Sequence, residues 1–146
     1  TAHHYYDEVA AQAKVPFLNI IDVVGQALAA LPQRPIRIGL LASTAVQRIN
    51  LYPPRLKPYD MLPFFPDDKH QAHVMDIIRA VKAKTNTCVH AQQLNAAIQN
   101  LGKKNADVML IACTELSAIS SQIKCDLPMY DASQLLAEEI VRRAKA

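Results

Sequence analysis

Three consecutive residues, Cys113, Thr114 and Glu115, place a thiol, a hydroxyl and a carboxylate directly after the apolar run 108–112. Such a run is typical of a strand that is buried on both faces of a parallel sheet. Backbone N–H groups and the positive end of a helix dipole lower the pKa of a thiol at a strand–helix junction from about 8.5 toward neutrality. A reactive thiolate is therefore one interpretation of Cys113, and a small buried apolar residue is the other.

A second apolar run, 36–42, ends at the small polar residues Ser43 and Thr44. Ligands of open α/β sheets bind beyond the carboxyl ends of the strands. If both runs are parallel strands, Ser43 and Thr44 lie at the same sheet edge as Cys113. The sequence therefore predicts one site at this edge.

Composition excludes several classes of protein. The chain has 146 residues, 51% of them hydrophobic, and 16 basic against 13 acidic residues, which gives a charge of +3. This composition opposes disorder and a nucleic-acid partner. The three glycines cannot form a Gly-rich phosphate loop, and no apolar run reaches the roughly 18 residues of a membrane span. We expect no membrane partner.

Cysteine and histidine spacing predicts neither a disulfide framework nor a metal site. The three cysteines, Cys88, Cys113 and Cys125, are odd in number and show no C-x-x-C spacing. His70 and His73 follow Asp67 at a predicted helix start, where a surface position is the more common role. We therefore expect no metal. The sequence shows no signal peptide, and we expect a cytoplasmic protein.

The elements that must position these residues alternate between strands and helices. The sequence predicts an α/β fold with a mostly parallel sheet flanked by helices. The expected strands are 16–20, 36–42, part of 55–66, 108–112 and 128–131. The expected helices are 5–13, 22–31 (capped by Asp22), one after 45, 66–82, 89–101, a short one from 116, and a final one ending at 146.

The segment Ala112–Leu116 resembles the second cysteine motif of the aspartate/glutamate racemase superfamily, and most of all that of aspartate racemases. Five further segments resemble the family in the same order along the chain: 1–9, 16–22, 39–43, 71–83 and 105–108. The resemblance implies two similar α/β halves related by pseudo-twofold symmetry, with the active site between them. It also implies catalysis without a cofactor, by two cysteines that act on opposite faces of the α-carbon.

By this resemblance Cys113 is one of the two catalytic bases. The carboxylate of Glu115, two residues later, offers an acid–base partner. The first family cysteine would precede Thr1, and neither Cys88 nor Cys125 matches its motif. Ala45 and Val46 stand where the family commonly has Gly-Thr, which removes one substrate hydrogen bond. The expected substrate-binding residues are Thr1, Ser43, Thr44, Thr114 and Lys82, with Lys84 as the alternative lysine.

The resemblance divides the chain into three parts: the tail of a first domain with a linker helix (1–34), a second α/β domain (35–133) and a helix that returns to the first domain (134–146). Val23, Val24 and Leu28 would then lie uncovered, so we expect a homodimer or association with a missing N-terminal half. The expected function is a racemase of aspartate or glutamate. A related two-cysteine racemase or isomerase with another substrate, and a non-catalytic remnant or binding module, are the alternatives.

Overall fold

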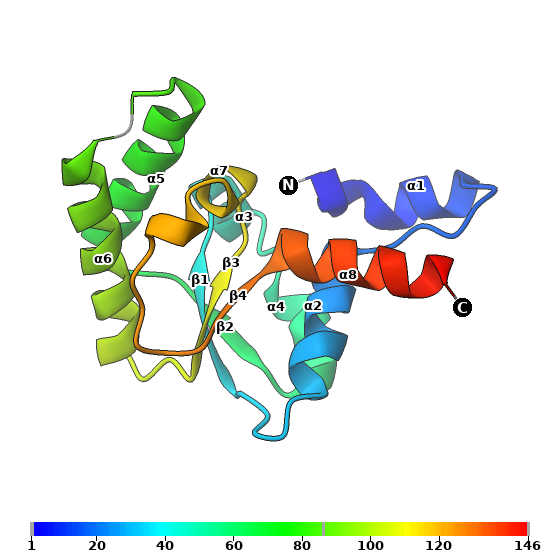
Figure 1. The fold of residues 1–146 in the computed structure, drawn as a ribbon. Helices are drawn as coiled ribbons and strands as arrows, with labels where there is room; N and C mark the ends of the chain where they lie inside the picture. Colours follow the sequence, from blue (N-terminus) through cyan, green and yellow to red (C-terminus); the bar gives the residue numbers. More distant parts are fainter. Residues whose placement is uncertain (1, 86, 146) are drawn as a thin grey trace.

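The computed structural model describes residues 2–85 and 87–145 and contains a four-stranded, fully parallel sheet. Its strands are β1 (Arg37–Leu41), β2 (Leu62–Phe64), β3 (Val108–Ile111) and β4 (Met129–Asp131), in the order β2-β1-β3-β4. Figure 1 shows the sheet in the middle of the molecule with helices on both sides. The predicted α/β class with a parallel sheet is confirmed.

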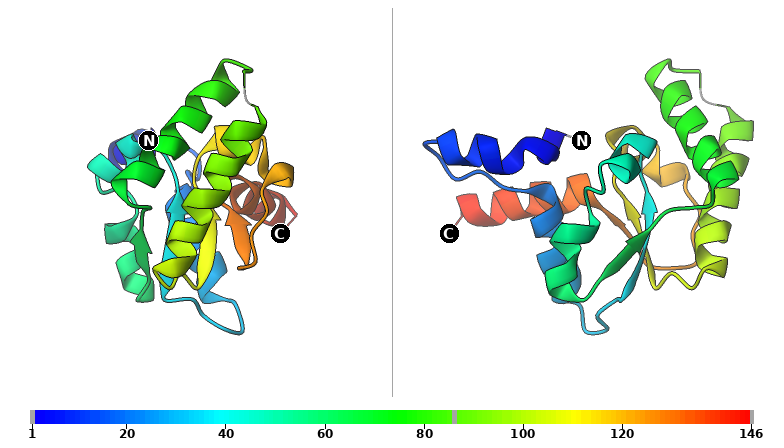
Figure 2. Two further views of the ribbon diagram at one scale, coloured as in Figure 1. Left: turned by 90° about the vertical axis from the view of Figure 1, so that its left-hand side faces the viewer. Right: turned by 180° about the vertical axis from the view of Figure 1, so that it is seen from behind.

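Two apolar layers cover the two faces of the sheet. On one face, α5 (Asp68–Lys82) and α6 (Cys88–Lys103) pack on side chains such as Leu41 and Met109. On the other face, α2 (Ile20–Ala29) and α4 (Pro53–Leu56) pack on Ile38 and Leu40. This alternation along β1 is the period of two that a strand imposes. The right-hand view of Figure 2 shows these two layers on opposite sides of the sheet.

The remaining helices are short or lie at the ends of the described chain. They are α1 (Tyr6–Gln12), α3 (Thr44–Arg48), α7 (Thr114–Ser117) and α8 (Ala132–Ala144), with 3-10 turns at Ala2–Tyr5, Lys57–Tyr59 and Ser120–Gln122. No helix in the described part of the chain combines the length and apolarity that a membrane span needs.

The predicted strand 16–20 is wrong, because α2 begins at Ile20. The side chain of Asn19 accepts a hydrogen bond of 2.9 Å from the backbone N–H of Ile21 and thereby caps the helix. Asp22, the predicted cap, lies in the first turn and pairs with Arg55 at 3.0 Å. A local cap therefore overrides the strand preference of an apolar run.

The expectation that the apolar stripe of α2 lies uncovered is also wrong. Val24 and Leu28 have no exposed surface and Val23 is 6% exposed. The first two belong to the apolar layer on β1 and β3, and α2 also packs against α8. The sheet of the same chain therefore buries this helix, while the three-part domain division stays a prediction.

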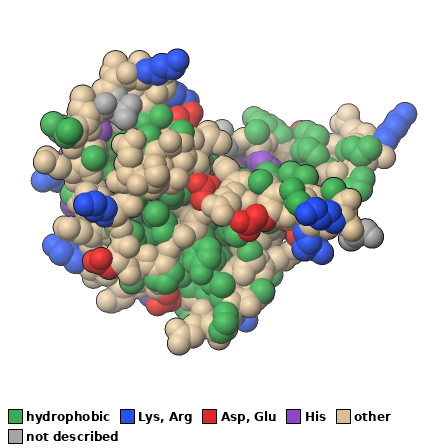
Figure 3. Space-filling model, in the orientation of Figure 1, with side chains coloured by type: hydrophobic (Ala, Val, Ile, Leu, Met, Phe, Trp, Pro, Cys, Tyr) green, Lys and Arg blue, Asp and Glu red, His purple; other side chains and the backbone are tan. Residues whose placement is uncertain are grey.

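Exposed apolar side chains gather instead on an arm that α1 and α8 form beside the sheet (Figures 1 and 3). None of the residues of α1 is buried. The exposed apolar residues of the arm and of the segment after α1 are Tyr5, Val9, Val15, Phe17, Ile140 and Val141.

Candidate active site

The carboxyl ends of three strands meet at one edge of the sheet. Leu41 of β1 pairs with Ile111 of β3, and Ile111 pairs with Asp131 of β4. The residues that follow these strands therefore share one place, as predicted for Ser43 and Cys113. A cavity of about 520 Å³ opens there. That volume lies in the range of small-molecule sites.

The cavity is lined by the strand ends, by α5 and by the first residues described. Its polar and charged lining residues are His3, Ser43, Tyr52, Lys82, Cys113, Thr114, Glu115 and Ser133. Its apolar lining residues include Val46, Met75, Ile78 and Ala112. Four of the sequence-predicted site residues other than Cys113 thus face the same cavity as that thiol.

Cys113 and Glu115 are in direct contact within this cavity. Cys113 has an extended backbone and precedes the short helix α7, so that its thiol donates a hydrogen bond of 2.9 Å to Oε2 of Glu115. The hydroxyl of Thr114 lies 3.3 Å from the same oxygen. Both side chains of the predicted acid–base pair are therefore within proton-transfer distance.

The predicted lowering of the Cys113 pKa is wrong, because the pKa of this thiol is raised to about 11. Burial is the largest cause, and the carboxylate of Glu115 adds to it because its charge disfavours a thiolate. The backbone N–H groups of Glu115 and Leu116 do lower the thiol pKa, as expected of a helix start, but the first two causes outweigh them.

Lys82 contacts the opposite oxygen of Glu115. Its Nζ lies 3.4 Å from Oε1, and it projects from the last turn of α5. The pKa of Glu115 is lowered, mainly because the Cys113 thiol donates to its carboxylate, with Lys82 as a further cause. Lys84 follows the helix in a left-handed conformation, with φ 56°, and does not line the cavity. Of the two lysines, the structure brings Lys82 to the site.

The other predicted substrate-binding residues are placed differently. Ser43 lines the cavity, whereas Thr44 does not. The backbone N–H of Thr44 points to Sδ of Met75 at 3.2 Å, and its hydroxyl accepts from Nε2 of Gln71 at 3.4 Å. Thr44 therefore joins α3 to α5. Thr1 lies outside the described residues.

Sequence reasoning missed three polar lining residues: His3, Tyr52 and Ser133. The pKa of His3 is lowered, chiefly because the ring is partly buried. Tyr52 is only 3% exposed and precedes two prolines, a pattern that indicates the end of a helix and not a binding site. Ser133 follows the predicted strand 128–131, and its position after a strand end was the available signal.

The remaining cysteines and histidines lie elsewhere. Cys88 is exposed at the start of α6 and Cys125 is half-buried, and neither lines the cavity. His70 contacts Asp67 at 2.6 Å within the cap of α5. No group of three or more His, Cys, Asp or Glu side chains in residues 2–85 and 87–145 is arranged to hold a metal ion.

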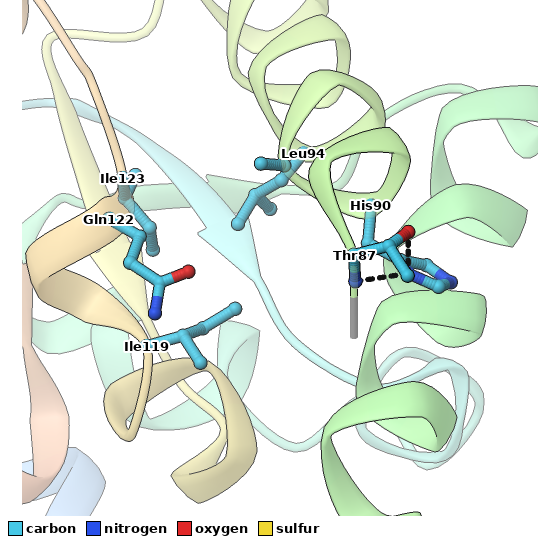
Figure 4. A pocket seen from close by; sticks show the side chains of 7 residues that line it. Thr87, His90, Leu94, Ile119, Gln122 and Ile123 are labelled. Atoms are coloured by element: carbon cyan, nitrogen blue, oxygen red, sulfur yellow. Dashed lines mark hydrogen bonds between the residues drawn. The ribbon is translucent and has the colours of Figure 1, made fainter. Parts of the chain in front are cut away.

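A second pocket lies between α6 and the segment after α7, where Thr87 and His90 face Ile119, Gln122 and Ile123 (Figure 4). The ring of His90 accepts a hydrogen bond from the backbone N–H of Thr87 at 3.0 Å, so that this pair caps α6. The pocket volume is about 10 Å³, which is about enough for one water molecule. This second pocket is therefore too small to hold an amino acid.

A thiol and carboxylate pair at the strand ends of a parallel α/β sheet agrees with the family comparison. The chain belongs to the Asp/Glu/hydantoin racemase family, whose family model matches residues 1–140. It is 28% identical over 141 residues to the broad specificity amino-acid racemase RacX of Bacillus subtilis, across 97% of this chain and 60% of RacX. It is also 27% identical over 139 residues to a protein of Pectobacterium carotovorum, described as the uncharacterized protein in the pnlA 3' region, across 94% of this chain and 91% of that protein.

Solved structures support the same relationship. An aspartate racemase of Picrophilus torridus is 28% identical and superposes with a TM-score of 0.79, across 99% of this chain and 58% of that chain. A putative Asp/Glu racemase of Yersinia pestis has a TM-score of 0.86 at 20% identity, which shows likeness of fold. The chain therefore spans about three fifths of the length of RacX and of the Picrophilus enzyme.

Proposed function

We propose that this chain supplies one proton-transferring face of an amino-acid racemase that works without a cofactor. The observation that carries the proposal is the Cys113 thiol on the wall of the cavity, 2.9 Å from the carboxylate of Glu115. Membership of a racemase family supports it. In this proposal Cys113 is the catalytic acid or base, and the carboxylate of Glu115 exchanges a proton with the Cys113 thiol.

Racemisation removes the α-proton from one face of the amino acid and returns a proton to the other face, so that two groups are required. With a pKa of about 11, Cys113 is a neutral thiol at neutral pH and begins as the proton donor. When Cys113 instead removes the α-proton, it must act as a thiolate. The ammonium group of the substrate then lowers the pKa of Cys113, because a nearby positive charge favours the thiolate. The family resemblance assigns the opposite face to a cysteine ahead of Thr1.

The α-carboxylate is expected to lie against Ser43 and Thr114. Both line the cavity, and each lies at or next to the start of a short helix. Negative charge grows on this carboxylate when the α-proton leaves, and hydroxyl and N–H donors stabilise it. Thr1, which resembles the family residue beside the other cysteine, completes this set in the proposal.

For the substrate side chain we propose aspartate or glutamate, with Lys82 as the group that binds the second carboxylate. Lys82 lines the cavity and forms an ion pair of 3.4 Å with Glu115. The second candidate is another amino acid, which the apolar lining residues Val46, Met75 and Ile78 favour. RacX, to which the chain is 28% identical, is a broad specificity amino-acid racemase, which agrees with this alternative.

We further propose that the exposed apolar residues of the α1–α8 arm bind a second copy or an N-terminal half, because contiguous apolar surface of this kind marks interaction sites. The three cysteines, which form no disulfide, fit a reducing cytoplasm.

The test is deuterium incorporation at the α-carbon, followed by mass spectrometry in D₂O for L-aspartate, L-glutamate, L-alanine and L-leucine. We expect exchange with the wild-type full-length protein and its loss on at least one face with Cys113→Ala. Cys88→Ala and Cys125→Ala are matched controls that remove a thiol outside the cavity and should exchange normally. Exchange by Cys113→Ala at the wild-type rate, on both faces, would refute the role of Cys113.

A further inference from the structure

We infer that the hydroxyl of Tyr52 is a further substrate-contacting group, which donates a hydrogen bond to the α-carboxylate and stabilises the charge that builds there in the transition state. The inference rests on the proposed racemase function and adds to it a residue that the sequence comparison did not single out. It depends on the position, burial and missing partner of this phenol.

Tyr52 lies in the wall of the same cavity as Cys113. The chain reaches it from β1 through α3, and its ring belongs to an apolar cluster with Ala132 and Val46, against which Ala112 also packs. Ala112 immediately precedes Cys113, and Ala132 immediately follows Asp131 at the end of β4. The ring therefore lies at the strand ends that form the site.

The backbone of Tyr52 is fixed. It precedes Pro53 and Pro54, which open α4, and its carbonyl accepts hydrogen bonds from the N–H groups of Arg55 at 3.2 Å and Leu56 at 3.0 Å. A buried ring on a fixed backbone holds its hydroxyl in one place. Fixed donors of this kind need no reorganisation when charge develops on the substrate.

The hydroxyl of Tyr52 has no hydrogen-bond partner among the described residues, although the side chain is only 3% exposed. Fully enclosed polar side-chain atoms without a partner belong to four other residues, Asn19, Gln71, His73 and Gln93. The Tyr52 hydroxyl is not among these fully enclosed atoms, and Tyr52 lines the cavity beside Cys113. A buried phenol normally finds a partner, which makes a bound ligand the partner expected here.

The protonation state decides what this hydroxyl can do. The pKa of Tyr52 is raised strongly, because burial and then the negative charges of Asp131 and Cys113 disfavour the phenolate. Tyr52 therefore stays protonated and does not act as a base beside Cys113. A permanently protonated phenol can donate to a carboxylate, which only accepts hydrogen bonds, whereas an ammonium group offers no acceptor.

The test compares Tyr52→Phe with Tyr59→Phe. Tyr52→Phe removes one oxygen that has no described partner, and Tyr59→Phe makes the same change in a ring that packs beside Gly25 outside the cavity. The substrate is whichever amino acid exchanges its α-proton in the deuterium experiment. With this substrate we expect kcat to fall about 10²-fold in Tyr52→Phe, with KM changed less than about threefold. Tyr59→Phe should keep the wild-type kcat.

Two further readouts separate this role from a structural one. The thermal midpoint of Tyr52→Phe should stay within about 2 °C of the wild type, because the variant keeps the packed ring. The shape of its pH–rate profile should also stay unchanged, because Tyr52 does not titrate in the working range. A wild-type kcat in Tyr52→Phe, a rise of KM alone, or a loss of rate matched by a loss of stability would each overturn the inference. If the wild-type chain exchanges none of the amino acids, the proposed function fails first and the inference falls with it.

Discussion

The substitution Glu115→Gln tests the electrostatics of the site without needing a substrate. Gln keeps the shape of Glu but removes the negative charge 2.9 Å from the Cys113 sulfur. Burial, the largest cause of the raised pKa, remains, while both contributions of Glu115 disappear. The pKa of Cys113 should therefore settle between its ordinary value of 9.0 and the present value of about 11.

These two limits fix the size of the effect. At about pH 8 a thiol of pKa about 11 is ionised in roughly one molecule per thousand. A thiol of pKa 9.0 is ionised about a hundred times more often. Because burial keeps part of the shift, we expect the thiolate population in Glu115→Gln to rise about tenfold. Release of Lys82 from its ion pair acts in the same direction.

The assay is the rate of alkylation by iodoacetamide, resolved by peptide mass spectrometry, because the thiolate is the reacting form. Cys88 is exposed on another helix and serves as the internal control, so the ratio of Cys113 to Cys88 labelling is measured. We expect that ratio to rise about tenfold at about pH 8 in Glu115→Gln. An unchanged or smaller ratio would contradict the assignment of Glu115 as a cause of the raised pKa.

Three further predictions concern stability. Gly25→Ala should destabilise the fold by about 1–2 kcal/mol in urea unfolding, because its Cβ would overlap the ring of Tyr59. This steric cost exceeds the gain from the better helix propensity of Ala. Gly102→Ala, whose Cβ meets nothing within 4 Å, should instead stabilise by up to about 1 kcal/mol, and the same sign for both variants would refute the steric argument. Asp107→Ala should cost about 1 kcal/mol, because the Asp107 carboxylate accepts 2.8 Å hydrogen bonds from two backbone N–H groups at the start of β1. Since the pKa of Asp107 is lowered in the fold, this contribution is complete above the ordinary pKa of 3.8 and disappears as the pH falls through the lowered value, so wild type and Asp107→Ala should converge in acid.

Most of the fold could be predicted from short-range patterns. The apolar runs 36–42 and 108–112 became β1 and β3, and the Asp67 cap and apolar periodicity predicted α5. The wrong prediction of a strand at 16–20 has a local cause. An apolar run after a proline forms a strand only if a partner strand is present. Here the side chain of Asn19 caps a helix instead.

The burial of α2 could not be predicted in the same way. Periodicity shows that a helix has an apolar face, but not which surface covers it. The family resemblance assigned residues 1–34 to another domain, and the expected uncovered stripe followed from that assignment. In the structure Leu28 and Val24 pack within the layer that covers β1 and β3, a long-range contact that no local pattern encodes.

Within the site, position was easier to predict than chemistry. The rule of strand ends placed Ser43 and Cys113 correctly beside one cavity. The predicted direction of the Cys113 pKa shift was wrong, because burial of the thiol, the largest cause, and then the carboxylate of Glu115 outweigh the backbone N–H groups. Tyr52 was missed because its burial depends on packing against residues about 60 and 80 positions further along the chain.

In the proposed mechanism, the contacts of Glu115 would link substrate choice to the base strength of the Cys113 thiolate. One carboxylate oxygen accepts from Cys113 and the other pairs with Lys82, so Lys82 offsets part of the charge that the sulfur meets. A substrate with a side-chain carboxylate would draw Lys82 away from Glu115, so that the full negative charge of Glu115 would act on Cys113. This charge raises the thiol pKa further and makes the Cys113 thiolate a stronger base. A neutral amino acid would leave the ion pair intact. In Lys82→Met the advantage of aspartate over alanine in α-proton exchange should therefore disappear through kcat as well as KM, whereas a lysine that only binds the side chain would change KM alone.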